Sequence, residues 1–134
     1  MTQTNADIVR ALILAQNAGD DDTLRDHLHP SIEFQTSAGV DGTPAVIRGR
    51  DALLDVVAQG RKQEGSFQIT LHEVETEGDH VFVVGTVAGD RGMRIPRSWI
   101  YRLEDGKIVA MESFAARAAA QRAWASLARP GSAE

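Results

Sequence analysis

The sequence predicts an α+β fold in which helices come first and an antiparallel sheet follows. In the first half, apolar residues mostly recur at helical spacing, whereas from Phe67 onward apolar and polar residues alternate as they do in strands. Short turns rich in Gly and Asp separate the alternating segments, which is typical of antiparallel hairpins. Helices followed by such a meander indicate a sheet with the helices packed on one face.

Three helices are expected in the first half of the chain. The first is capped by Thr4 or Asn5 and ends at Gly19, because glycine adopts the left-handed cap conformation without a Cβ clash. The second is short and is stopped by Pro30, which cannot continue a helix. The third opens at residues 49–51, and Gly60 lies near its expected end.

The remaining elements are strands and one further helix. Strands are expected at residues 31–36, 67–75, 80–88, 94–103 and 107–114, and a last helix at residues 116–127. Residues 38–44 are rich in Gly, Asp and Pro, so a loop is expected there. A single domain is therefore expected over residues 1–134, with a core from about 5 to 128 and a flexible tail at 129–134.

Composition excludes several classes of function. The net charge is −5 and no Lys/Arg cluster exists, which argues against nucleic acid and anionic membranes as partners. The chain has no cysteine, and its four histidines lack a nearby third ligand, so no metal site is expected. No nucleotide-binding motif occurs, and no cofactor is expected. The polar N-terminus is unlike a signal peptide, so the cytoplasm is the expected compartment.

The strand expected at 80–88 is apolar on both faces. Phe82 and Val84 lie on one face, and Val81 and Val83 on the other. Strands of this kind are covered on both sides, and the N-terminal helices cover only one. We therefore expect a homodimer in which an identical subunit meets the outer face of the sheet. The alternative is that the last helix folds over this face.

Five motifs in this order resemble the SnoaL-like group of the nuclear transport factor 2-like superfamily. They lie at residues 17–20 (NAGD), 29–34 (HPSIEF), 49–53 (GRDAL), 78–81 (GDHV) and 99–109 (WIYRLEDGKIV), and the resemblance covers about residues 5–120. It implies a cone-shaped, curved antiparallel or mixed sheet with the three N-terminal helices on its concave face, and it leaves an extra C-terminal helix. It also implies a pocket between the sheet and the helices.

Most catalytic groups that the resemblance implies are missing from the corresponding positions of this chain. The tyrosine and two aspartates of ketosteroid isomerases correspond to Leu12, Thr36 and Trp99, none of which has the required group. Arg97 corresponds to the arginine of the epoxide hydrolases, but their two carboxylates fall at Trp99 and Ser113. The histidine and aspartate of polyketide cyclases fall at Trp99 and Ala116.

Strand alternation and the family register together predict a largely apolar pocket. The predicted lining is Leu12, Gln16, Phe34, Thr36, Val56, Phe82, Val84, Thr86, Arg97, Trp99, Tyr101, Met111 and Ser113. This lining favours the binding of a small hydrophobic molecule, with no assignable reaction. One alternative is an isomerase, cyclase or hydrolase acting on a carbonyl compound or epoxide, with Arg97 and Tyr101 as oxyanion stabilisers. A second alternative is a non-catalytic dimeric scaffold.

Two candidate residues have structural alternatives. Arg97 either binds a carboxylate or enolate of the ligand, or lies at the mouth of the cone, or forms an ion pair with Glu112 or another acid. Tyr101 either donates a hydrogen bond to a ligand carbonyl or is a core residue with a satisfied hydroxyl.

Overall fold

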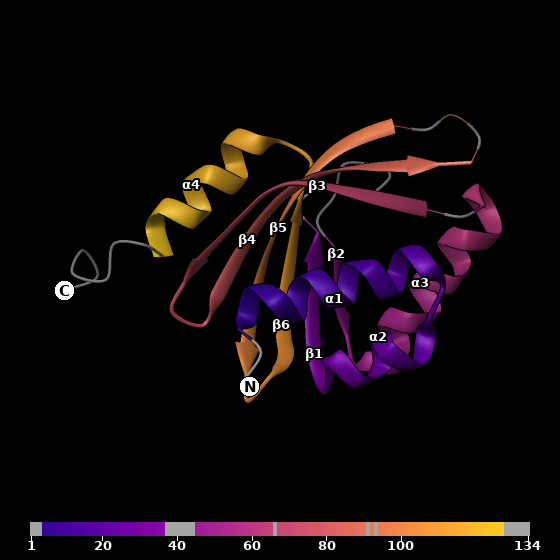
Figure 1. Ribbon diagram of the computed structural model, residues 1–134, viewed down its shortest axis with the longest axis horizontal. Coiled ribbons are helices and arrows are strands. Elements are labelled where there is room, and N and C mark those ends of the chain that lie inside the picture. The colour runs from indigo at the N-terminus through magenta and orange to yellow at the C-terminus, as the bar shows by residue number, and fades with distance from the viewer. Residues whose placement is uncertain (1–3, 37–44, 66, 91, 93, 128–134) are drawn as a thin grey trace.

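The computed structural model describes residues 4–36, 45–65, 67–90, 92 and 94–127. The expected loop at 38–44 and the expected tail at 129–134 lie outside these residues. Four helices and a six-stranded mixed sheet make up the described part of the chain (Figure 1), which confirms the predicted α+β class. In chain order the elements are α1 (Asn5–Ala18), α2 (Asp21–His27), β1 (Leu28–Thr36), β2 (Ala45–Arg48), α3 (Arg50–Glu64), β3 (Phe67–Glu77), β4 (His80–Gly89), β5 (Arg94–Glu104), β6 (Lys107–Phe114) and α4 (Arg117–Leu127).

The strand order is β2-β1-β6-β5-β4-β3. Strands β3 to β6 form the predicted antiparallel meander, with β4 paired to β3 and β5. Strand β1 runs parallel to β6 and antiparallel to β2, a short strand that the sequence pattern did not predict. The helix α3 continues past Gly60 and ends at Gly65, so tertiary packing outweighs the low helix propensity of one internal glycine.

Local sequence signals fix both ends of α1. Thr4 and Asp7 form a reciprocal capping box at its start, in which each side chain accepts from the other residue's backbone N–H. Gly19 ends the helix in the left-handed conformation, with φ 72°. Both ends therefore lie where the sequence predicts them.

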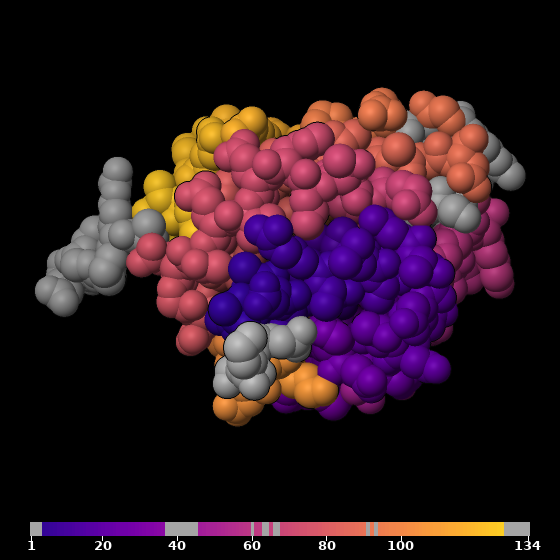
Figure 2. Space-filling view, in the orientation of Figure 1, coloured from indigo at the N-terminus to yellow at the C-terminus, as the bar shows by residue number. Residues whose placement is uncertain are grey.

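Helices α1, α2 and α3 cover one face of the sheet, which we call the inner face. Figure 2 shows the indigo atoms of α1 across the front of the molecule, next to the pink atoms of β3 and β4. The main core lies between these layers and includes Val9, Ile32, Val81, Leu103 and Ile108, each at most 2% exposed. It positions the inner face of β4, β5 and β6 against the helices.

Helix α4 covers part of the opposite, outer face and forms a second apolar cluster there (Figure 1). Its Ala120 is buried with Phe82 and Ile100 of the sheet. Trp124 of α4 stacks on Phe82 with ring centroids 5.5 Å apart. The chain's own last helix thus covers the apolar outer face of β4, so that face does not require a partner subunit.

No helix among the described residues is long and apolar enough to span a membrane. The same part of the chain brings no three His, Asp or Glu side chains close enough to hold a metal ion.

Candidate functional site

A cavity of about 350 Å³ lies between α3 and the inner face of the sheet. Its lining comes from two helices and five strands that are far apart in the sequence. The described residues that line it are Gln16, Phe34, Leu53, Val56, Val57, Ile69, Val87, Arg97, Trp99, Tyr101, Met111 and Ser113. This cavity is the candidate site.

Eight of the predicted lining residues meet in this cavity: Gln16, Phe34, Val56, Arg97, Trp99, Tyr101, Met111 and Ser113. All five residues named for β5 and β6 are among them: Arg97, Trp99, Tyr101, Met111 and Ser113. Leu12 lines a smaller pocket of about 40 Å³, which shares Gln16, Leu53, Val57 and Met111 with the cavity. Thr36 lies beside Ser113 in the sheet register but is not among the lining residues.

The predicted direction of three β4 side chains is wrong. Phe82 and Val84 belong to the outer apolar cluster under α4. The hydroxyl Oγ1 of Thr86 lies 2.8 Å from Nε2 of His72, and both residues line an outer-face pocket with Val84. The alternation of β4 is therefore opposite to the prediction. Because both faces of this strand are apolar, hydrophobic alternation alone did not distinguish them.

Four lining residues were not predicted: Leu53, Val57, Ile69 and Val87. Leu53 and Val57 lie four residues apart on α3, so the helical spacing of apolar residues is the sequence signal that could have found them. Val87 follows from the corrected β4 register, in which the odd positions face inward. Ile69 comes from β3, the strand beside β4.

Arg97 is the charged residue among the described lining residues. Its Nη1 donates a hydrogen bond to Oγ of Ser113 at 3.2 Å. The five ion pairs found among the described residues do not include Arg97. Glu112, the expected structural partner, instead lines a groove on the outer face. The guanidinium therefore retains free donors at the cavity.

Tyr101 is the deepest polar side chain of the lining and is only 2% exposed. Burial raises the pKa of its phenol well above the ordinary value, so the hydroxyl stays protonated at physiological pH. No described residue hydrogen-bonds this hydroxyl, and it is not among the fully buried unsatisfied atoms. A protonated donor that lacks a protein partner at a cavity wall is available to a ligand acceptor.

The described lining contains no Asp, Glu or His. General base catalysis needs such a group within hydrogen-bond reach of the substrate. The cavity's polar groups can instead hold a ligand oxygen through Arg97, Ser113, Tyr101 and Gln16. Binding and polarisation, without proton abstraction by the lining, are what this arrangement offers.

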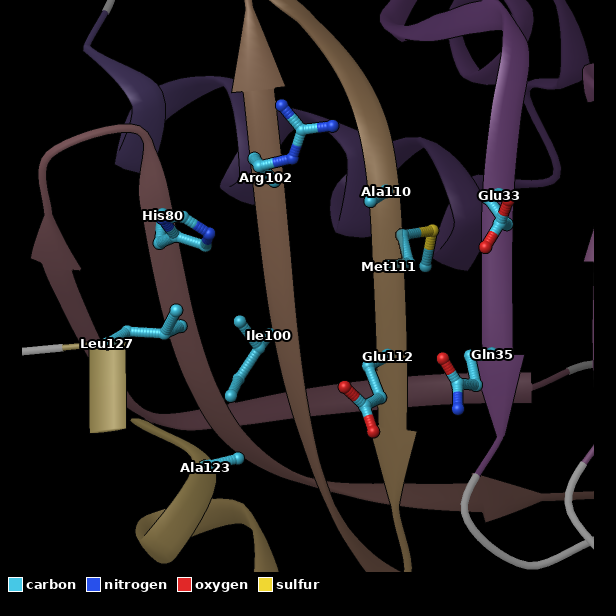
Figure 3. A pocket seen from close by; sticks show the side chains of 10 residues that line it. All are labelled: Glu33, Gln35, His80, Ile100, Arg102, Ala110, Met111, Glu112, Ala123 and Leu127. Atoms are coloured by element: carbon cyan, nitrogen blue, oxygen red, sulfur yellow. The ribbon is translucent and has the colours of Figure 1, made fainter. Parts of the chain in front are cut away.

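A second hollow of about 240 Å³ lies on the outer face, in the part that α4 leaves open. Figure 3 shows Glu33 and Gln35 on β1 and Glu112 on β6, with Arg102 and His80 on the neighbouring strands and Leu127 on α4. Burial raises the pKa of Glu112. Burial, followed by the charge of Arg102, lowers the pKa of His80. Acidic groups therefore lie on one side of this groove and nitrogen-bearing groups on the other.

The sequence model of the SnoaL-like domain family matches residues 9–111 of the chain. No relative was found among curated proteins. The match begins within α1 and ends within β6, before α4.

Solved structures share the fold at low sequence identity. A protein of unknown function with a cystatin-like fold from Xanthomonas campestris is 22% identical, with a TM-score of 0.77 over 91% of this chain and 98% of that one. A proposed polyketide cyclase from Sinorhizobium meliloti is 23% identical, with a TM-score of 0.69 over 80% and 93% of the two chains. A hypothetical protein with a ketosteroid isomerase-like fold from Catenulispora acidiphila, in complex with trimethylamine, is 18% identical, with a TM-score of 0.70 over 82% and 85%. At these identities the likeness shows the fold alone.

Proposed function

The chain belongs to the SnoaL-like domain family, and from this membership we propose that it binds a small, largely hydrophobic molecule in the cavity between α3 and the sheet. The observation that carries the proposal is the lining itself. Apolar side chains from α3, β1, β3, β4 and β6 make up most of the lining, and a few polar groups lie among them. Ligand sites of this size, about 300–1,000 Å³, are typically built in this way.

Binding is favoured over a base-dependent reaction. The described lining supplies hydrogen-bond donors at Arg97 and Tyr101 but no carboxylate or imidazole. An isomerase or cyclase that removes a proton from its substrate needs such a base. An enzymatic role would therefore require a reaction driven by oxyanion stabilisation, without a base from these residues.

A thermal-shift screen of lipophilic ketones, acids and epoxides tests the proposal. We expect at least one compound class to raise the melting temperature of the wild-type protein, because a ligand that binds only the folded state stabilises it. Val57→Trp places a large ring at the cavity wall and should abolish the shift. Val46→Trp is the matched control, because Val46 is 47% exposed and lies outside the cavity. If both variants lose the rise in melting temperature, or if both keep it, binding in this cavity is contradicted.

We further propose that two copies associate through the part of the outer face that α4 leaves open. Glu33 and Glu112 lie on one side of its groove, and Arg102 and His80 on the other (Figure 3). A two-fold axis through the groove would place the acidic side of one copy over Arg102 of the other, so the face is complementary to itself. Such a dimer is also the basis of the scaffold alternative.

Charge reversal tests this dimer in sedimentation velocity experiments. Glu112→Arg and Arg102→Glu should each weaken association, because each brings like charges together. The double variant should restore it, because the charges are exchanged and remain complementary. Arg122→Glu, on the exposed side of α4, is the control and should associate like the wild type. A wild-type protein that stays monomeric at high concentration would contradict the proposal.

A further inference from the structure

We infer that the cavity selects an elongated organic anion that has an oxyanion at one end and a hydrogen-bond acceptor at the other. A carboxylate or enolate oxygen is held by Arg97 with Ser113, a carbonyl or hydroxyl oxygen is held by Tyr101, and a flat apolar body lies along Trp99 between them. This inference rests on the proposed function, since it names the ligand class of the same cavity.

The Arg97 end requires an anion. An arginine cannot lose its charge to lower the cost of partial burial, so it needs an acceptor or an anionic ligand. Its contact within the described chain is the neutral hydroxyl of Ser113, at 3.2 Å. One N–H of five is used in this contact, and the guanidinium fork matches the two oxygens of a carboxylate. The Ser113 hydroxyl can in turn donate its proton to the same oxyanion.

The Tyr101 end requires a neutral acceptor. Its hydroxyl is protonated and finds no partner among the described residues. A second anionic group would be placed in the deepest and most apolar part of the cavity, with no positive charge beside it. A carbonyl or hydroxyl oxygen accepts the hydrogen bond without that desolvation cost.

Strand geometry sets the distance between the two ends. Arg97, Trp99 and Tyr101 alternate along β5 and face the same side, so the Cα atoms of Arg97 and Tyr101 lie about 13 Å apart. Arg97 reaches Ser113, which is the register partner of Trp99 and not of Arg97. Its guanidinium therefore leans toward Tyr101, and the two donors are closer together than the Cα atoms are. A bicyclic aromatic body fits this interval better than a single small ring.

A matched set of naphthalene derivatives tests the inference by titration calorimetry. The probe is 6-acetyl-2-naphthoate, which has a carboxylate and a ketone at opposite ends of a flat body. The single-ended controls are 2-naphthoate and 2-acetylnaphthalene. We expect the two-ended probe to bind most tightly, with each end contributing about tenfold, the factor that corresponds to one good hydrogen-bonded contact.

Variants assign each end to its residue. Arg97→Met should remove the gain in affinity that the carboxylate provides and keep the gain that the ketone provides. Tyr101→Phe should remove the gain from the ketone and keep the gain from the carboxylate. Circular dichroism shows whether Arg97→Met folds. If it does not, Arg97→Gln replaces it in the same titrations. Arg94→Met is the control, because Arg94 lies on the same strand, is exposed and is not among the lining residues.

Each outcome separates the inference from the proposed function. Equal affinity of 2-acetylnaphthalene and 6-acetyl-2-naphthoate for the wild type would overturn the inference and leave ligand binding intact. So would an advantage of the carboxylate that persists in both Arg97 variants. If none of the naphthalene derivatives binds but other lipophilic compounds from the screen do, the inference alone would again be overturned. Failure of every compound in the screen would overturn both.

Discussion

The carboxamide of Asn17 forms two hydrogen bonds with the backbone of Ile69. Its Nδ2 donates to the carbonyl oxygen of Ile69 at 3.0 Å, and its Oδ1 accepts from the N–H of Ile69 at 2.7 Å. Strand β3 is the last in the described sheet, so no strand among the described residues pairs with its outer edge. One side chain at the end of α1 thus takes the place of a strand at this edge and joins the helix to the sheet that forms the cavity wall.

We expect Asn17→Ala to lower the free energy of unfolding by about 1–3 kcal/mol, because both backbone groups of Ile69 lose their partner. Urea denaturation measures the change. Asn17→Asp keeps an acceptor but loses the donor, so it should fall between alanine and the wild type. A loss no larger than that of Gln121→Ala, a change on the exposed side of α4, would contradict this role.

Gly85→Ala should destabilise the fold by about 1–3 kcal/mol, the usual cost of overpacking. A Cβ at this position would lie 2.6 Å from the carbonyl oxygen of Thr70 and 3.4 Å from the ring of Trp99. The backbone of β3 would have to shift, and the cavity wall with it. Thermal unfolding measures the change in stability. The fluorescence of Trp99, recorded in a Trp124→Phe background, reports whether the cavity wall around Trp99 has changed. An unchanged melting temperature would mean that β3 moves freely.

Trp124→Ala should loosen α4 from the sheet, because the indole stacks on Phe82. We expect a loss of about 1–3 kcal/mol from the reduced burial and the lost aromatic pair. Amide exchange should then accelerate in α4 (Arg117–Leu127) and remain slow in α1. Uniform acceleration over the whole chain would instead show that α4 unfolds only with the rest of the domain.

Glu112→Gln should stabilise the protein at neutral pH. Burial raises the folded-state pKa of Glu112 above its ordinary 4.5, so ionisation favours the unfolded chain. The cost is absent below pH 4.5 and grows as the pH rises through the folded-state pKa. The variant should therefore be more stable than the wild type near pH 7, and the difference should vanish in acid. Denaturant midpoints for both proteins across this range measure it; a difference that is constant with pH would contradict the assignment.

Several parts of the fold follow from local sequence signals. The ends of α1 are set by the Thr4–Asp7 capping box and by Gly19, and β6 has the bounds that its alternation predicts. Arg97, Trp99 and Tyr101 share one face of β5, because residues two apart along a strand point to the same side. These features depend on residues close together in the chain, which is why the sequence reveals them.

Tertiary structure decided which side chains of β4 face inward and what covers the outer face of the sheet. Residues 81–84 are apolar at every position, so hydrophobic alternation favours neither register. Packing of α4 on Phe82, Val84 and Ile100 selects the register of β4. The same packing covers these three residues, so they need no partner subunit. The short pairing of β1 with β2 and the Arg97–Ser113 contact likewise join residues that are distant in sequence. Amino-acid order alone determined which residue types could line a cavity, and the packing of distant segments determined which of them do.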